Sequence, residues 1–190
     1  MRELTYLVAV SLDGYIAAPD HTFDAFPMQG DHLDWIFREY ADTLPTVGLA
    51  RVGVQADNSR FDTVLMGWNT YAAGFAAGVT DPYQHLRQYV FSRTHDEADG
   101  EIVLTDRDPV AVVRELKAEP TGTGIWLCGG GQLASTLYDE IDRFVFKVNP
   151  VLLGAGIPVF AERGYTPRTL TRVASRPFES GVVVNDYRRA

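Results

Sequence analysis

The sequence predicts an α/β protein with a mixed, mostly parallel sheet of about eight strands and an antiparallel C-terminal end. Residues 4–10 form an almost wholly apolar run, which is typical of a strand buried on both faces of a parallel sheet. Most later runs of strand type are separated by helical patterns. The last two, at residues 169–174 and 181–187, follow each other without a helix and therefore predict antiparallel strands.

Two of the predicted strands end at glycines and continue directly as helices. Residues 61–66 run into Gly67, and residues 125–128 run into the three glycines 129–131, which precede a helical pattern at residues 132–139. Free N–H groups and the positive end of the helix dipole favour an anionic group, such as a phosphate, at such helix starts. A tight turn without a ligand explains one junction equally well, but two junctions in one chain favour a ligand site.

Shorter patterns predict the remaining elements. We expect strands at residues 89–91, 101–104 and 143–148, and helices at residues 31–42, 47–57 and 109–116. Asp108 and Pro109 suit the N-cap and the first helical position of the third helix, and Asp31 is expected to cap the first. Residues 15–17 fit either a hairpin or a loop that covers a ligand, and the apolar loop at residues 19–30 fits either a lid or a lobe of the core.

Composition limits the classes of protein and partner. The 190 residues, of which 46% are apolar, predict a single domain over residues 1–190. A net charge of −8 argues against a nucleic-acid partner. No apolar run reaches the roughly 18 to 20 residues that cross a membrane, so no membrane partner is expected. Cys128 is the only cysteine, which excludes an internal disulfide and fits a cytoplasmic location.

Several familiar catalytic and metal-binding patterns are missing from the chain. The spacing of His and Cys predicts no metal site, and the four histidines are expected at the surface: His21, His32, His85 and His95. There is no Walker loop and no Gly-x-Ser-x-Gly elbow. Because no Gly-x-Gly-x-x-Gly follows the first strand, an ordinary Rossmann site is not expected either.

Five segments, taken in order, resemble those of the dihydrofolate reductase-like fold. They are Ser11–Ala17, Val64–Tyr71, Phe91–Thr94, Trp126–Gly131 and Asn149–Phe160. The last segment is similar to the reductase domain of bacterial riboflavin biosynthesis and its stand-alone relatives. The resemblance covers nearly the whole chain and implies a three-layer α/β/α architecture.

The resemblance also implies that NADPH binds in an extended pose across the strand ends. Carried over by position, the cofactor-binding residues are Ala9, Ile16, Gly67, Trp68, Asn69, Thr70, Ser92, Arg93, Cys128, Gly129, Gly130, Gly131, Gln132 and Leu133. Ala9 and Ile16 would contact the nicotinamide side. Ser92 and Arg93 would face the 2′-phosphate, which suits the permanently charged, planar guanidinium. The family further implies a cis peptide bond between the first two glycines of the 129–131 turn.

Three departures from the family pattern bear on the site. Trp68 stands where dihydrofolate reductases usually carry a basic residue, and Ala134 stands where they often carry Tyr. The folate enzymes use a carboxylate on the first helix to bind the pteridine and assist its protonation. Asp31 and Asp34 lie near that place, and we choose Asp34 as the catalytic acid. The alternative is that Asp31 caps the helix and Asp34 faces solvent.

The resemblance implies an NADPH-dependent reductase that acts on a small heterocyclic or ribosylaminopyrimidine-type substrate, in the manner of a 5-amino-6-(5-phosphoribosylamino)uracil reductase. Lys147 is the best single candidate for contacting a substrate phosphate. Two alternatives remain: a dihydrofolate or pteridine reductase, and a nucleotide-binding protein of the same fold without turnover. The apolar, strand-rich C-terminal region, together with the family resemblance, predicts a homodimer.

Overall fold

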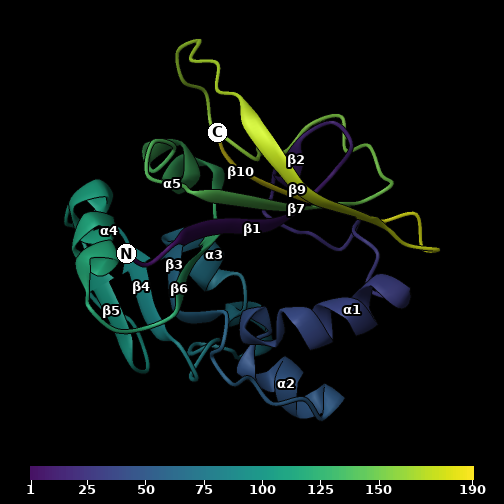
Figure 1. Ribbon diagram of the computed structural model, residues 1–190. Coiled ribbons are helices and arrows are strands. Elements are labelled where there is room, and N and C mark those ends of the chain that lie inside the picture. Colours follow the sequence, from purple (N-terminus) through teal and green to yellow (C-terminus); the bar gives the residue numbers. More distant parts are fainter.

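The computed structural model describes residues 1–190 and has three layers, with one large sheet between two layers of helices (Figure 1). The sheet has eight strands in the order β5-β4-β3-β6-β1-β7-β10-β9. These strands are β1 (Leu4–Val10), β3 (Phe61–Gly67), β4 (Arg87–Phe91), β5 (Ile102–Thr105), β6 (Gly124–Gly129), β7 (Arg143–Val148), β9 (Leu170–Pro177) and β10 (Val183–Arg189). Neighbours pair in parallel except at β10, which is antiparallel to both β7 and β9. The predicted mixed sheet with an antiparallel end is confirmed.

A second, two-stranded sheet joins two loops that are distant in the sequence. Strand β2 (Tyr15–Ala17) pairs antiparallel with β8 (Ile157–Pro158) and not with β1, so the hairpin interpretation of residues 15–17 is wrong. The Val159 N–H also donates to the Gly14 carbonyl at 2.9 Å. The segment after β1 is therefore held against the glycine-rich loop that follows β7.

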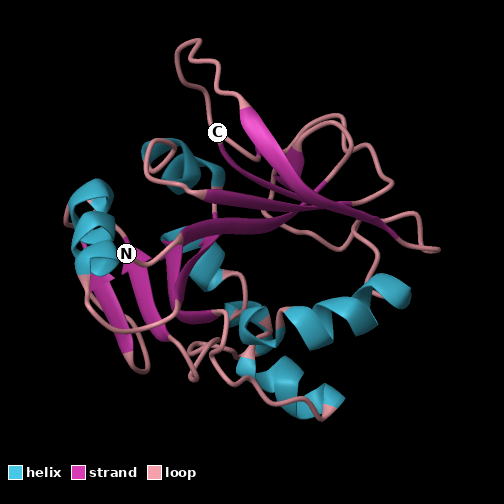
Figure 2. Ribbon diagram, viewed as in Figure 1, coloured by secondary structure: helices cyan, strands magenta, loops and turns pink.

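The helices cover both faces of the large sheet (Figure 2). They are α1 (Asp31–Glu39), α2 (Thr46–Val52), α3 (Trp68–Ala72), α4 (Pro109–Ala118) and α5 (Gly131–Thr136), with short 3₁₀ turns η1 (Ala41–Thr43) and η2 (Phe75–Ala77). Helices α4 and α5 lie on one side of the sheet, and α1 and α2 lie on the other (Figure 1). As predicted, the Asp108 side chain accepts a hydrogen bond from the Val110 N–H at the start of α4, with Pro109 in the first turn.

Three helices are shorter than the sequence pattern suggests. Helix α1 stops at Glu39, and the predicted last turn is the separate 3₁₀ turn η1. Helix α2 ends at Val52, because the next residue, Gly53, adopts a left-handed conformation with φ 68°. Helix α5 ends at Thr136, and the rest of the predicted helix to residue 139 forms turns. None of the helices combines the length and the apolar character that crossing a membrane requires.

The core is divided into two clusters by the sheet. Successive residues of one strand point to opposite faces. Leu65 and Leu127 accordingly pack with α4 and α5 in one cluster, whereas Val64 and Trp126 pack in the other, on the side of α1. Because both faces of the central strands are covered, these strands are continuous apolar runs in the sequence. Polar groups are found instead at the ends of the strands.

Candidate active site

The two glycine junctions lie side by side at one edge of the sheet. Strands β3 and β6 are parallel neighbours, with Met66 of β3 paired with Gly129 of β6, so their carboxyl ends meet there. A Cβ atom on Gly67 would lie 3.9 Å from both the Gly129 carbonyl oxygen and the Gly130 nitrogen. Ligands of open α/β sheets bind at such strand ends. The structure therefore brings together the two junctions from which the sequence predicts a ligand site.

The three glycines of the turn have two different roles. The Gly129–Gly130 peptide bond is cis, as predicted. A Cβ atom on either residue would meet only the Thr70 hydroxyl oxygen, at 3.6 Å, so the backbone is open on that side. A Cβ atom on Gly131 would instead lie 2.2 Å from the Pro158 carbonyl oxygen. The first two glycines leave room for a ligand, and the third permits close packing against β8.

The helix starts place the other predicted residues of these junctions. Trp68, Asn69 and Thr70 form the first turn of α3, and Asn69 is exposed. Gln132 is exposed in the first turn of α5. Leu133, which was predicted to line the cofactor, is only 7% exposed and belongs to the core cluster below the turn. It therefore supports the turn from the core side.

A compact polar turn follows β4 at the same edge. The Ser92 hydroxyl oxygen accepts hydrogen bonds from the N–H groups of Thr94 at 3.2 Å and His95 at 3.0 Å. The His95 ring stacks on Trp68, with centroids 3.6 Å apart and planes 7° apart. Arg93 is exposed and forms no ion pair within the protein. The turn thus presents one free guanidinium, and an imidazole lies against the Trp that replaces the family's basic residue.

Sequence reasoning missed His95, and the chain offers little signal for it. Its imidazole Nδ1 lies 3.0 Å from the Ser92 hydroxyl oxygen and 3.1 Å from the Thr94 hydroxyl oxygen. Only the short spacing from Ser92 hints at this cluster. The stack on Trp68 joins residues 27 positions apart, so it becomes visible only in the fold.

The predicted nicotinamide side is built by the segment after β1. Ala9 lies near the carboxyl end of β1, and Ile16 lies in β2. The Asp13 carboxylate fixes this segment by accepting from the Ser11 hydroxyl at 2.6 Å and from the backbone N–H groups of residues 153 and 154. The Ser11 hydroxyl, helped by these N–H groups, lowers the pKa of Asp13 to about 2. The carboxylate therefore stays ionised and holds two loops together.

Cys128 ends β6 immediately before the glycine turn. Its thiol is partly buried, and its Sγ lies 3.9 Å from the Tyr83 hydroxyl oxygen. Burial raises the pKa of the Cys128 thiol to about 12. A thiol in this state packs as a small apolar group and is a poor nucleophile. No group of three or more His, Cys, Asp or Glu side chains comes together to hold a metal ion.

The two aspartates proposed for the first helix do not face the sheet. Gly30 occupies the N-cap position of α1, so the expectation that Asp31 caps this helix is wrong. The Asp31 carboxylate instead accepts from the backbone N–H groups of residues 179 and 180, at 2.8 and 3.1 Å. These bonds tie α1 to the loop between β9 and β10. Asp34 lies on the exposed side of the helix, and the structure supplies no contact that supports its assignment as the catalytic acid.

His32 and Lys147 occupy the place where a carboxylate was sought. His32 is fully buried, which corrects the expectation of a surface residue, and its Nδ1 lies 2.9 Å from the Ser180 hydroxyl oxygen. Burial, and secondly the charge of Lys147, lower the pKa of His32. The Pro27 carbonyl acts in the opposite direction and raises the pKa of His32, but the effect of burial is larger. The Nε2 atom of His32 is buried and has no hydrogen-bond partner. Both side chains lie on the α1 side of the sheet, since Phe178, which contacts His32, and Val184, which pairs with Lys147, belong to the cluster on that side.

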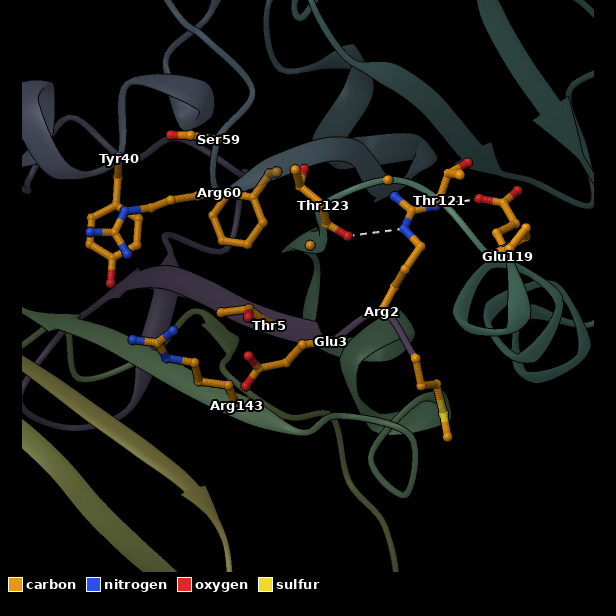
Figure 3. A pocket seen from close by; sticks show the side chains of 15 residues that line it. Arg2, Glu3, Thr5, Tyr40, Ser59, Arg60, Glu119, Thr121, Thr123 and Arg143 are labelled. Atoms are coloured by element: carbon orange, nitrogen blue, oxygen red, sulfur yellow. Dashed lines mark hydrogen bonds and ion pairs between the residues drawn. The ribbon is translucent and has the colours of Figure 1, made fainter.

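A polar pocket of about 430 Å³ lies at the opposite edge of the sheet, among the amino ends of the strands (Figure 3). The buried Arg2 guanidinium at this pocket pairs with Asp62 and Glu119 and donates to the Thr123 carbonyl at 3.0 Å. None of the predicted site residues lines it. Because Arg2 is already neutralised by carboxylates, we interpret the pocket as a structural charge cluster and place the active site at the carboxyl edge.

Comparison with known proteins agrees with this geometry. The model of the RibD C-terminal domain family matches residues 2–184. The chain is 34% identical over 167 residues to YwjB, an uncharacterized protein of Bacillus subtilis (strain 168), which covers 85% of this chain and 84% of that protein. It is 28% identical over 195 residues to YyaP, a second uncharacterized protein of the same organism, which covers 96% and 92% of the two chains.

Solved structures show the same fold at low identity. A protein of Shewanella sp. PV-4, assigned provisionally to riboflavin biosynthesis, superposes with a TM-score of 0.75 at 23% identity and covers 100% of this chain and 99% of that one. A diaminohydroxyphosphoribosylaminopyrimidine deaminase/5-amino-6-(5-phosphoribosylamino)uracil reductase of Thermotoga maritima gives a TM-score of 0.66 at 15% identity, over 100% and 57% of the two chains. The chain belongs to the RibD C-terminal domain family and has its dihydrofolate reductase-like fold.

Proposed function

We propose that this protein is an NADPH-dependent reductase that acts on a small heterocyclic or ribosylaminopyrimidine-type substrate. The observation that carries the proposal is the open backbone at Gly129 and Gly130. It faces Thr70 and lies beside the Gly67 junction. A side chain on either glycine would narrow this space, so the cradle suits a group that must approach the backbone closely. A pyrophosphate is such a group.

The protein's own groups would hold the two ends of the cofactor. Near the cradle, the N–H groups at the start of α3 and the Thr70 hydroxyl suit the pyrophosphate. At the end of β4, the unpaired Arg93 and the hydroxyl of Ser92 suit a 2′-phosphate. At the other end, Ala9 and Ile16 would position the nicotinamide, which supplies the hydride when the cofactor is bound. The family membership supports this assignment.

The substrate side favours the riboflavin-type reaction over pteridine reduction. The folate enzymes are expected to need a carboxylate on the first helix, but α1 turns His32 toward the sheet and leaves Asp34 exposed. The 5-amino-6-(5-phosphoribosylamino)uracil reductase named for the Thermotoga relative acts on a phosphorylated ribosylaminopyrimidine. We therefore place a substrate of this class first.

A turnover assay tests the reaction. Oxidation of NADPH is followed at saturating cofactor with 5-amino-6-(5-phosphoribosylamino)uracil and, separately, with dihydrofolate. We expect turnover with the first substrate and none with the second. Turnover with dihydrofolate alone would contradict the substrate class. Tight NADPH binding without turnover on either compound or on a wider panel of heterocycles would instead identify a nucleotide-binding protein.

A further inference from the structure

Lys147 is a partly buried cation that has no partner within the protein. Arg2, Lys117 and Arg143 each form an ion pair with at least one carboxylate. The Lys147 ammonium forms neither an ion pair nor a hydrogen bond, and burial alone lowers its pKa. Burying a charge without a partner costs free energy. Such a group is a candidate for ligand binding, since a ligand can provide the missing countercharge.

The sheet places Lys147 beside the predicted nicotinamide position. Within the register, Lys147 of β7 pairs with Ala9 of β1 and with Val184 of β10, so the three side chains emerge on one face. This is the face covered by α1, because Val184 belongs to the core cluster on that side. Lys147 therefore lies on the α1 face of the sheet, next to Ala9.

The groups that face Lys147 from α1 do not neutralise it. Burial and the charge of Lys147 both lower the pKa of His32, which favours its neutral form, and an imidazole supplies no countercharge to an ammonium. The nearest acid on the helix, Asp31, is engaged by two backbone N–H groups of the β9–β10 loop. Asp34 is exposed on the far side of the helix. Helix α1 thus offers Lys147 no carboxylate as a partner.

We infer that Lys147 binds an oxyanion of the second substrate, a phosphate or a carboxylate, beside Ala9 on the α1 face of the sheet. The identification of that ligand as the hydride acceptor rests on the proposed reductase function, whereas anion binding by Lys147 does not. An ammonium here repels a protonated pteridine ring and attracts an anion. The substrate is therefore a small anionic molecule.

The composition of the chain allows a direct test, because it contains only two lysines, Lys117 and Lys147. Protein labelled with ¹³C and ¹⁵N in lysine gives two side-chain signals, and Lys147→Met assigns them by removing one. Sodium phosphate and sodium acetate are titrated in separate samples, with sodium chloride holding the ionic strength constant. Lys117 is the internal control, since its Nζ is already paired with Asp142 at 2.6 Å.

We expect the Lys147 signal to shift and saturate with one or both anions while the Lys117 signal stays fixed. If the shift saturates at a lower concentration of phosphate than of acetate, the preferred ligand is a phosphate; the opposite order indicates a carboxylate. Lys147→Arg, which keeps the charge, should retain anion affinity within about tenfold, whereas Lys147→Met should lose it. A Lys147 signal that responds no more than Lys117, or phosphate binding by ³¹P NMR that survives Lys147→Met unchanged, would overturn the inference.

NADPH binding in the same samples separates this inference from the proposed function. NADPH affinity should be the same in wild type and Lys147→Met, because Lys147 is assigned to the substrate and is not among the residues expected to contact NADPH. A chain that fails to bind NADPH but still shows a saturable Lys147 shift would contradict the reductase proposal and support the anion site. A chain that binds NADPH but shows no response of the Lys147 signal would support the reductase proposal and contradict the anion site.

Discussion

At the scale of single residues, the candidate site combines glycine backbone at residues 67 and 129–131 with side chains from distant segments. The glycines were predicted because a strand that ends at glycine is a local signal. The positions of His32 and His95 depend on contacts between distant segments, such as the stack of His95 on Trp68. Asp31 has an N-cap residue type, but the partners it finds are backbone groups 148 and 149 residues away.

The unpaired ammonium predicts that Lys147→Met stabilises the protein. Burial lowers the folded-state pKa of Lys147 below its ordinary value of 10.5, so the unfolded chain holds the proton more tightly. The cost is fully present below the folded pKa and disappears as pH rises past 10.5. A gain of about 1 kcal/mol at pH 7 would raise Tm by about 2–4 °C.

Thermal unfolding of wild type, Lys147→Met and Lys147→Arg at pH 7 and at pH 10.5 measures this effect. The methionine variant should have the higher Tm at pH 7, and the difference should narrow at pH 10.5. Lys147→Arg, which keeps the unpaired charge, should show no such gain. A methionine variant less stable than wild type at pH 7 would mean that Lys147 has a protein partner after all.

At the scale of elements, strands were predicted more accurately than helix ends. Strands β1 and β7 have the predicted bounds, because both lie inside the sheet and carry apolar residues on both faces. The lengths of α2 and α5 were overestimated. The pattern of apolar residues continues beyond the point where the backbone leaves the helix, which for α2 is set by the left-handed Gly53. The pairing of β2 with β8 joins loops about 140 residues apart and has no local signal.

The glycine turn yields a paired prediction at this scale. Gly131→Ala would place a Cβ atom 2.2 Å from the Pro158 carbonyl oxygen, so α5 and β8 must separate. We expect a loss of about 1–3 kcal/mol in the free energy of unfolding. Gly130→Ala meets only Thr70 at 3.6 Å, and its φ of −89° suits alanine, so the fold should survive while NADPH affinity falls. Urea unfolding and fluorescence titration with NADPH check the two effects, and equal losses of stability would contradict the division of roles.

At the scale of the whole molecule, the order of elements and the antiparallel end followed from the sequence, and the family resemblance supplied the three layers. Neither the sequence pattern nor the family resemblance predicted the charge cluster of Arg2 with Asp62 and Glu119 at the amino edge, because its members come from separate parts of the chain. The oligomeric state stays a prediction. Strand β9 is the last strand of the sheet order, and its residues from Thr171 to Pro177 are exposed.

That exposure suggests where a second copy would pack. We propose a homodimer in which the β9 surface is covered by its counterpart, and we expect sedimentation equilibrium to give about twice the chain mass of 21.1 kDa. Val173, which is 52% exposed at the centre of this strand, is the position to test. Val173→Asp should shift the protein toward the monomer, whereas Val52→Asp on α2, at 41% exposure, should not. A wild-type species of single-chain mass at all concentrations would refute the dimer.

The most direct test of the central claim is the ratio of NADPH to NADH affinity, measured by calorimetry for wild type and Arg93→Ala. If the strand-end site binds a 2′-phosphorylated dinucleotide, wild type should prefer NADPH. Arg93→Ala should weaken NADPH by about 10- to 100-fold while leaving NADH nearly unchanged. Arg51→Ala, which removes an exposed and unpaired arginine from α2, should leave both affinities as they are. Equal wild-type affinities for the two nucleotides would contradict the assignment of Arg93, and no binding of either would contradict the reductase proposal itself.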